Sequence, residues 1–220
     1  GVYMEHADAV LTNSKIYNNT GGNSGGVLCW DGAPTLSNLL IQDNAGSLVG
    51  GIKVSYGDVK IINSTIVSNG TSGIWAGDGA VLTVINSIIF NNGDLPENQI
   101  LNGGASRNIS YSLIEGGYEG IGNLDSNPIF INAPDNESTL SEYSPAIGAG
   151  LDTAFIPTTD IDGNPRPNPA GSNPDMGAYE NPFGTPQHMP ITINVPDDYA
   201  TIQEGLNAAD STDTILVQPG

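Results

Sequence analysis

The chain has 220 residues, with 24 acidic and 5 basic side chains, and its formal net charge is −19 at pH 7. This balance excludes nucleic acid and anionic membrane surfaces as partners, because both require clustered Lys and Arg, and no apolar run approaches the about 18 residues of a membrane span. Gly and Pro, with 29 and 15 residues, favour short strands and turns over a helical bundle, and a single cysteine excludes an internal disulfide.

A sequence repeat runs through residues 1–120. The segments LTNSKIYNN, LSNLLIQDN, IINSTIVSN and VINSIIFNN begin at Leu11, Leu36, Ile61 and Val84, and a degenerate copy, ISYSLIEGG, begins at Ile109. Apolar stretches led by glycine, GVYM, GVLC, GIKV and GIWA, precede the first four copies. A period of about 22–25 residues with short strands and Asn/Gly turns predicts an all-β fold, a solenoid of stacked parallel strands.

The alternation within each copy predicts which side chains form the core. The expected internal columns are Val2, Val27, Ile52 and Ile74; Met4, Cys29, Val54 and Ala76; Ile16, Ile41, Ile66, Ile89 and Ile114; and Leu11, Leu36, Ile61, Val84 and Ile109. Asparagine recurs at two corners, at Asn13, Asn38, Asn63 and Asn86 and at Asn19, Asn44, Asn69 and Asn92. We expect stacked amides to bond from coil to coil there.

These coils resemble the right-handed parallel β-helix of the pectin-lyase-like superfamily over residues 1–120. The stretches NLDSNPIFIN, LSEYSPAIGAG and DIDGNPRPNPAGSNPDMGAYE, which begin at Asn123, Leu140 and Asp160, resemble the closing segment of bacterial secreted β-helix proteins of the choice-of-anchor Q kind. The resemblance implies that residues 121–186 close the solenoid. It also implies an extracellular or cell-surface location.

The last part of the chain, residues 187–220, begins as a Pro-rich linker. From Val195 it resembles the start of a β-helix domain, with one short amphipathic helix that caps the solenoid in that family. We expect Ile202, Leu206 and Ala209 on one face of this helix, followed by a strand from Thr214 to Val217. We expect the cap to belong to a tandem β-helix, to fold back on its own rod or to cover the open end of another subunit, and of these three the tandem arrangement is favoured.

An outward stripe is the candidate ligand-binding surface. His6, Asp31, Tyr56 and Asp78 occupy equivalent turn positions, Tyr3, Lys53 and Trp75 share an adjacent outward column, and Trp30 lies near it. Aromatic faces beside carboxylates suit a polysaccharide, because rings cover apolar sugar faces while acids bond hydroxyls. The structural alternative is that these aromatics only stabilise an exposed sheet.

Asp31, Asp78 and Lys53 are the weak catalytic candidates of this stripe, for a lyase or a glycosidase. Two carboxylates on nearby coils can act as acid and base, although any acidic solenoid offers such pairs. Basic residues are scarce, and a −19 chain repels acidic polymers unless Ca²⁺ bridges them. No catalytic assignment is therefore made, and the leaning is toward a protein that is not an enzyme.

A calcium loop is the one cofactor site suggested by the sequence. Asp160, Asp162 and Asn164 place oxygen ligands on alternate residues beside a glycine. A plain Asp-Gly turn is the alternative, since the distal bidentate glutamate of an EF-hand is missing. Arg166, close by, is expected to neutralise this acidic stretch.

Two functions therefore compete. The first is a non-enzymatic structural or adhesive rod segment of a large bacterial surface or secreted protein, which self-associates end to end or stands in tandem. The second is a carbohydrate-binding or polysaccharide-degrading module that uses the outward stripe. A groove along Trp75 and Lys53 favours the second, whereas end-to-end stacking favours the first.

Overall fold

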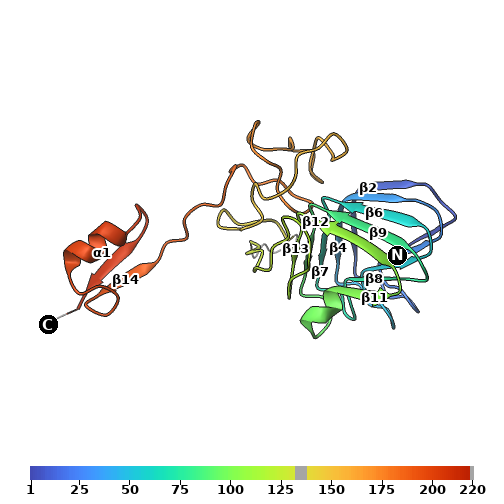
Figure 1. Cartoon of the computed structure of the whole chain (residues 1–220), viewed down its shortest axis with the longest axis horizontal. Coiled ribbons are helices and arrows are strands. Elements are labelled where there is room, and N and C mark those ends of the chain that lie inside the picture. Colours follow the sequence, from blue (N-terminus) through green and yellow to red (C-terminus); the bar gives the residue numbers. More distant parts are fainter. Residues whose placement is uncertain (132–137, 219–220) are drawn as a thin grey trace. The chain divides into compact units, whose positions relative to one another are not determined.

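A computed structural model describes residues 1–131 and 138–218 (Figure 1). The chain divides into two units, Gly1–Pro186 and Gln187–Gly220. Within the larger unit, strands stack in parallel from one coil to the next, which confirms the expected parallel β-helix. No helix in the described ranges is long and apolar enough to cross a membrane.

The first sheet contributes one strand per coil. It comprises, in spatial order, β1 (Val2–Glu5), β3 (Val27–Trp30), β5 (Ile52–Ser55), β8 (Ile74–Gly77) and β11 (Ile100–Gly103). Each strand pairs in parallel with the next, so equivalent residues of successive coils lie side by side. A short 3₁₀ helix, Pro96–Gln99, leads into β11.

The second sheet starts with two long strands and continues with pairs of shorter ones. The long strands are β2 (Val10–Tyr17) and β4 (Thr35–Gln42), and the later coils divide the same path into β6 (Asp58–Ile62) and β7 (Thr65–Val67), β9 (Val81–Ile85) and β10 (Ile88–Phe90), and β12 (Ser106–Ser110) and β13 (Leu113–Ile114). The divisions fall at Asn63 and Asn86, whose φ angles of 44° and 52° turn the backbone. Asparagine tolerates this left-handed conformation better than most residues.

The expected core columns are all present between these sheets. Val27, Ile52 and Ile74 are fully buried and paired in register, as are Cys29, Val54 and Ala76. The isoleucine column pairs from Ile16 to Ile114, and the Leu11 column pairs through to Ile109. Apolar burial repeated in every coil is the main driving force for this stacking.

One asparagine column forms a continuous ladder of side-chain amides. The Nδ2 atoms of Asn19, Asn44 and Asn69 each donate to Oδ1 of the asparagine in the next coil, at 2.9, 3.1 and 2.9 Å. Asn92 continues the ladder to Oε1 of Gln99, at 2.8 Å. Asn44, Asn69 and Asn92 are almost fully buried, so these bonds satisfy polar groups that water cannot reach.

The other asparagine column binds the irregular segment 138–181. Nδ2 of Asn38 donates to the carbonyl of Thr159, and Nδ2 of Asn63 donates to the carbonyl of Asp175. Leu40, Ile88 and Leu113 on the outer side of the second sheet pack in one cluster with apolar residues of this segment, which are Leu140, Ala146, Ile147, Ile161, Met176, Ala178 and Tyr179. The segment therefore covers the side of the coils.

The smaller unit is a parallel strand pair with a connecting helix. Strands β14 (Thr192–Val195) and β15 (Thr214–Val217) pair in register, and α1 (Ile202–Ala208) lies between them in sequence. Thr201 and Glu204 form a capping box at the start of α1. The short helix near the C-terminus is thus present, and it is the single α-helix of the described residues.

Candidate functional site

The outer face of the first sheet carries two columns of side chains. Tyr3, Leu28, Lys53 and Trp75 pair from strand to strand, so they form one column as the alternation predicts. The second column contains Glu5, Trp30, Ser55, Gly77 and Gly103. Trp75 of the first column lies beside the two glycines of the second, Gly77 on its own strand and Gly103 on the next.

Lys53 occupies the centre of this face. Its Nζ lies 5.1 Å from the ring centroid of Trp75 and 6.0 Å from that of Trp30, in the range of cation–π contacts. Only 8% of the residue is exposed, because the two indoles cover its stem. Trp30 also meets the ring of Tyr56 edge-on, with centroids 5.5 Å apart. The four side chains form one cluster, here called the Trp–Lys cluster.

The indole of Trp75 packs directly against two glycines. A Cβ atom on Gly103 would overlap Cζ2 of the indole, and one on Gly77 would overlap Cη2. The absence of side chains at these two positions lets the ring lie along the sheet. This role was not predicted from the sequence, although both glycines fall at outward strand positions, where glycine is unfavourable without such a contact.

The four predicted corner residues do share one position. His6, Asp31, Tyr56 and Asp78 all have positive φ angles, between 49° and 63°. His6 and Asp31 are joined by a bond of 2.9 Å between Nδ1 and Oδ2. Glycine at positive φ follows three of these four residues, so those three corners have two consecutive left-handed residues, whereas Ala7 follows His6 without a positive φ. The stripe is therefore a structural corner as well as a candidate surface.

The chemistry of Asp31 argues against an acid role in catalysis. The backbone N–H of Gly32 and then His6 hold the pKa of Asp31 below its usual value, which keeps the carboxylate ionised. Asp78 lies two coils away, about 10 Å at the usual strand spacing, and the coil between them contributes Tyr56. This backbone spacing is slightly above the roughly 6.5–9.5 Å that separates the two carboxyl groups of inverting glycosidases.

The predicted calcium loop is closed by the protein's own hydrogen bonds. Oδ1 of Asp160 accepts the N–H groups of Asp162 and Asn164, and its Oδ2 accepts Nδ2 of Asn164 and the N–H of Glu180. Oδ1 of Asp162 lies 3.5 Å from Nζ of Lys15. A calcium ion would compete with these donors. No group of three or more His, Cys, Asp or Glu residues suited to a metal was found in the described part of the chain.

A buried ionic network lies under this loop. Arg166 pairs with Glu180, at 3.1 Å between Nη1 and Oε1, and both side chains are inaccessible to water. Arg166 also donates to the carbonyls of Asp175, Gly177 and Ala178. The ion pair of Arg166 is therefore with Glu180, while Asp160 of the acidic stretch also contributes its negative charge to the guanidinium, as the sequence suggested.

Asp175 completes the network. Its two oxygens accept the N–H groups of Gly148 and Asn181, at 2.8 and 2.7 Å. Burial, together with the charge of Glu180, raises the pKa of Asp175 from 3.8 to about 7. Burial also raises the pKa of Glu180. Three buried carboxylates, counting Asp160, thus surround one guanidinium in the segment that covers the coils.

The expected capping face of α1 makes little contact within its own unit. Gly205 is the buried residue of the helix, and a Cβ there would lie 3.2 Å from Cγ2 of Val195. Ile202 and Leu206 remain 49% and 55% exposed, and Ala209 is the C-terminal cap residue. The helix packs against the strands at Gly205, so its larger apolar side chains stay exposed. Their capping role stays a prediction.

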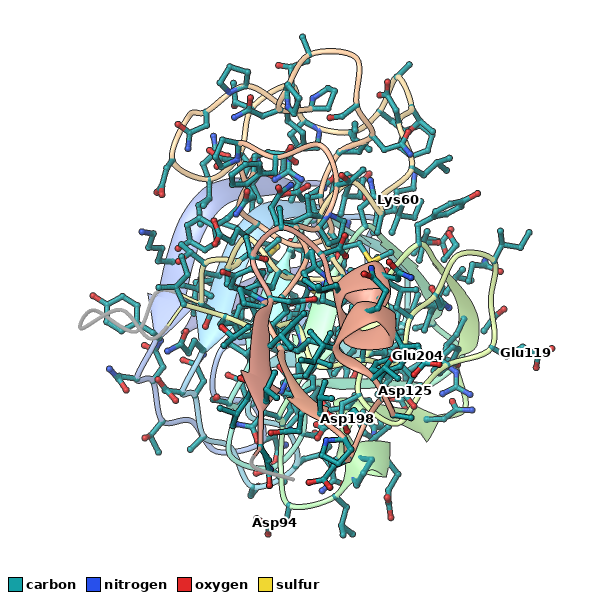
Figure 2. All side chains as sticks on the ribbon, turned by 90° about the vertical axis from the view of Figure 1, so that its left-hand side faces the viewer. Lys60, Asp94, Glu119, Asp125, Asp198 and Glu204 are labelled. Atoms are coloured by element: carbon teal, nitrogen blue, oxygen red, sulfur yellow. The ribbon has the colours of Figure 1, made fainter. Side chains whose placement is uncertain are left out.

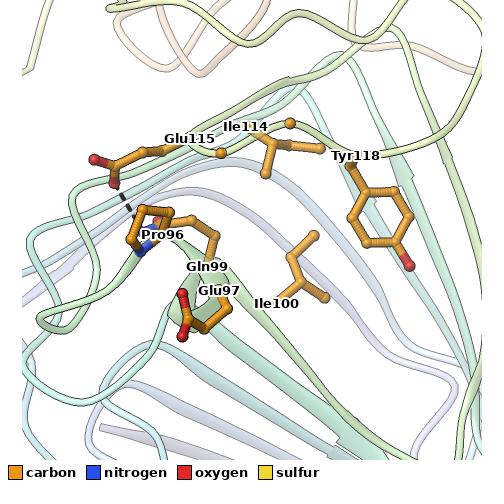
Figure 3. Close-up of a pocket in the computed structure, with 9 residues that line it drawn as sticks. Pro96, Glu97, Gln99, Ile100, Ile114, Glu115 and Tyr118 are labelled. Carbon is orange, nitrogen blue, oxygen red and sulfur yellow. Dashed lines mark hydrogen bonds between the residues drawn. The ribbon is translucent and has the colours of Figure 1, made fainter.

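The asparagine ladder ends beside a pocket of about 350 Å³ (Figure 3). Nε2 of Gln99 donates to Oε2 of Glu115 at 2.9 Å, so the ladder of side-chain hydrogen bonds ends at a carboxylate. Ile100, Ile114 and Tyr118 line the same pocket. Exposed acidic side chains such as Asp94 and Glu119 extend outward from the coils (Figure 2).

The comparisons with known proteins agree with this geometry. Residues 1–114 match the family described as "Right handed beta helix region". Searches of curated proteins and of solved structures gave no match. The match covers all five strands of the first sheet, so it includes the whole Trp–Lys cluster.

Proposed function

The chain belongs to the right-handed β-helix family, and we propose that it serves as a non-enzymatic structural segment of an extracellular rod that extends by end-to-end stacking. The observation that carries the proposal is the match between β15 and β1. Both strands present alternating apolar residues in a parallel stack, Ile215 and Val217 in one, Val2 and Met4 in the other. The acidic surface and the resemblance to secreted proteins of the choice-of-anchor Q kind favour an extracellular location.

The strand pair β14–β15 and the strand pair β1–β3 have the same pattern of paired apolar residues. Ile193 pairs with Ile215 and Val195 with Val217, just as Val2 pairs with Val27. If β15 of one copy pairs with β1 of another, Ile215 meets Val2 and Val217 meets Met4. The apolar columns then run from one copy into the next without interruption, and the chain direction stays the same.

The backbone of β1 has groups available for this pairing. The N–H groups of Val2 and His6 donate to the carbonyls of Gly26 and Trp30, so by the alternation of a parallel ladder those of Tyr3 and Glu5 point the other way. Within the described chain, β1 pairs with β3 alone. Strand edges of this kind join other chains readily unless they are covered.

Sedimentation velocity over a range of protein concentrations tests the stacking. The wild-type chain should form larger, elongated species as concentration rises. The variant Tyr3→Pro should stay monomeric, because proline removes the N–H that points away from β3 and is tolerated at a strand edge. The matched control Tyr3→Ala removes the same side chain, keeps the N–H and should still associate. A wild-type chain that stays monomeric throughout, or equal association of both variants, would contradict the proposal.

Carbohydrate binding is the second candidate, and the Trp–Lys cluster favours it. Trp30 and Tyr56 are well exposed on the sheet, beside the carboxylate of Asp31. Such a platform can cover the apolar face of a sugar ring. Quenching of tryptophan fluorescence by a panel of neutral and acidic oligosaccharides tests this, with Trp30→Ala as the variant that should abolish the response. Release of unsaturated or reducing-sugar products would instead indicate an enzyme.

A further inference from the structure

A second pocket lies between the second sheet and the irregular segment that covers it. It has a volume of about 370 Å³ and is lined by Thr35, Lys60, Ile62, Thr83, Ile85 and Phe155. The first five residues come from β4, β6 and β9, and Phe155 comes from the segment. The pocket is separate from the Trp–Lys cluster, which lies on the first sheet.

Strand register arranges the pocket into a polar column and an apolar floor. Lys60 pairs with Thr35 on one side and with Thr83 on the other, so a threonine lies beside it in each neighbouring strand. Ile62 pairs with Ile85 two residues further along. The polar column and the apolar floor therefore run parallel to each other across successive coils.

The segment that supplies Phe155 is attached to the second sheet by Asn86. Asn86 directly follows β9, and it makes two bonds to the backbone of Leu151: its Nδ2 donates to the carbonyl, and its Oδ1 accepts the N–H, at 2.9 and 2.8 Å. Phe155 follows four residues later and is 59% exposed. The backbone of the segment is thus attached to the sheet four residues before Phe155.

Lys60 is the basic side chain that the fold leaves without a partner. Lys15 lies by Asp162, Lys53 lies between indoles, and Arg107 and Arg166 meet Tyr118 and Glu180. Within the described residues the side chain of Lys60 makes no ion pair or hydrogen bond, and it is exposed (Figure 2). Asp58 faces outward two residues earlier on the same strand, without an ion pair to Lys60, and disfavours a second negative charge on a ligand.

From this arrangement we propose that the pocket binds a monocarboxylic acid with an apolar body. The carboxylate accepts a charge-assisted hydrogen bond from Nζ of Lys60 and hydroxyl bonds from Thr35 or Thr83. The apolar body packs between Ile62, Ile85 and the ring of Phe155. This inference is independent of the stacking proposed above, because none of these residues belongs to β1 or β15.

Methyl-resolved NMR of the whole chain tests the proposal, with Ile62 and Ile85 as reporters. The probe is 3-phenylpropanoate, and its neutral counterpart 3-phenylpropan-1-ol has the same ring without the charge. The acid should shift both isoleucine methyl signals saturably and bind about 10-fold more tightly than the alcohol, which is the difference expected from one charge-assisted bond. Equal binding of the two probes, or no saturable shift at these methyls, would overturn the proposal.

Three variants assign the contacts. Lys60→Gln should remove the preference for the acid and leave the binding of the alcohol unchanged. Phe155→Ala should weaken both probes by a similar factor, because it removes apolar surface and no charge. Lys15→Gln is the matched control, since it deletes one positive charge elsewhere on the chain. A loss of acid preference in the Lys15 variant equal to that in the Lys60 variant would mean that net charge, and not the pocket, causes it.

Discussion

Asn69 donates a hydrogen bond of 2.9 Å from its Nδ2 to Oδ1 of Asn92, its counterpart in the next coil. The same Nδ2 also donates to the carbonyl of Ile41 in the preceding coil, and Oδ1 of Asn69 accepts from Nδ2 of Asn44. One side chain thus connects three successive coils in the interior. The ladder adds directional bonds to a core that apolar packing alone would leave free to slip.

Substitution of Asn69 by alanine should therefore destabilise the coils strongly. It leaves buried partners in both neighbouring coils without a bond, at a cost of about 3 kcal/mol or more. Urea unfolding followed by tryptophan fluorescence measures the effect on this unit, because both tryptophans lie in the first sheet. The control Asn23→Ala changes an exposed asparagine and should stay within about 0.5 kcal/mol of wild type. Equal effects would show that the ladder contributes nothing.

The buried network should make stability depend on pH. Because the pKa of Asp175 rises to about 7 on folding, the folded chain holds a proton between about pH 4 and 7 that the unfolded chain releases. The unfolding free energy should accordingly fall as pH rises through this window. Asp175→Asn should flatten the slope, leaving the smaller contribution of Glu180. Thermal unfolding at a series of pH values measures both slopes, and identical slopes would disprove the assignment to Asp175.

Removal of Arg166 should release the covering segment. Arg166→Met leaves Glu180 buried without its counter-ion, which costs about 3–5 kcal/mol. The double variant Arg166→Met/Glu180→Gln removes both charges and should recover part of that loss. Hydrogen exchange at the amides of Ile161 and Met176, which bond to the carbonyls of Ala178 and Ala146, follows the segment directly. Unchanged exchange in the single variant would contradict this role.

A methyl group on Gly103 should displace the indole of Trp75. Gly103→Ala places a Cβ where Cζ2 of the ring now lies, so the ring should move into water and its fluorescence should shift to the red. Gly22→Ala is the matched control, because a Cβ at Gly22 meets no other atom within 4 Å. A spectrum of Gly103→Ala identical to wild type would mean that Trp75 does not lie on this glycine.

Cys29 should be chemically inert in the folded chain. Burial raises the pKa of its thiol to about 12, and thiols react as thiolates. A chromogenic disulfide reagent at pH 8 should therefore modify it only when the coils open, and urea should accelerate the reaction. Rapid stoichiometric modification without denaturant would contradict the burial of this core column.

The repeat pattern was sufficient to predict the stacked coils but not what covers them. Core residues such as Ile52 and Ile66 have apolar counterparts one repeat away in the sequence. Because the coils stack in parallel, these counterparts lie side by side. The segment 138–181 has no period, and its contacts, such as Asn38 to Thr159, join residues far apart in sequence. The pocket at Lys60 needs Phe155 from that segment, so no local pattern could reveal it.

The outward stripe was predicted in register but not in its contacts. Alternation placed Lys53 and Trp75 in one column, which the strand pairing shows. Two contacts depend on the directions in which side chains lean across neighbouring strands. They are the contact of Lys53 with Trp30 and the packing of Trp75 against the two glycines. Spacing in the sequence carries no information on those directions.

Disulfide trapping between Tyr3→Cys and Leu216→Cys tests the end-to-end rod most directly. When Ile215 pairs with Val2, these two outward positions lie side by side at about 4.8 Å, a separation that a disulfide can bridge. Oxidation should then produce a ladder of covalent oligomers, whereas the register-shifted pair Glu5→Cys with Leu216→Cys should produce far fewer. Monomers alone, or cross-links within single chains, would contradict stacking between copies.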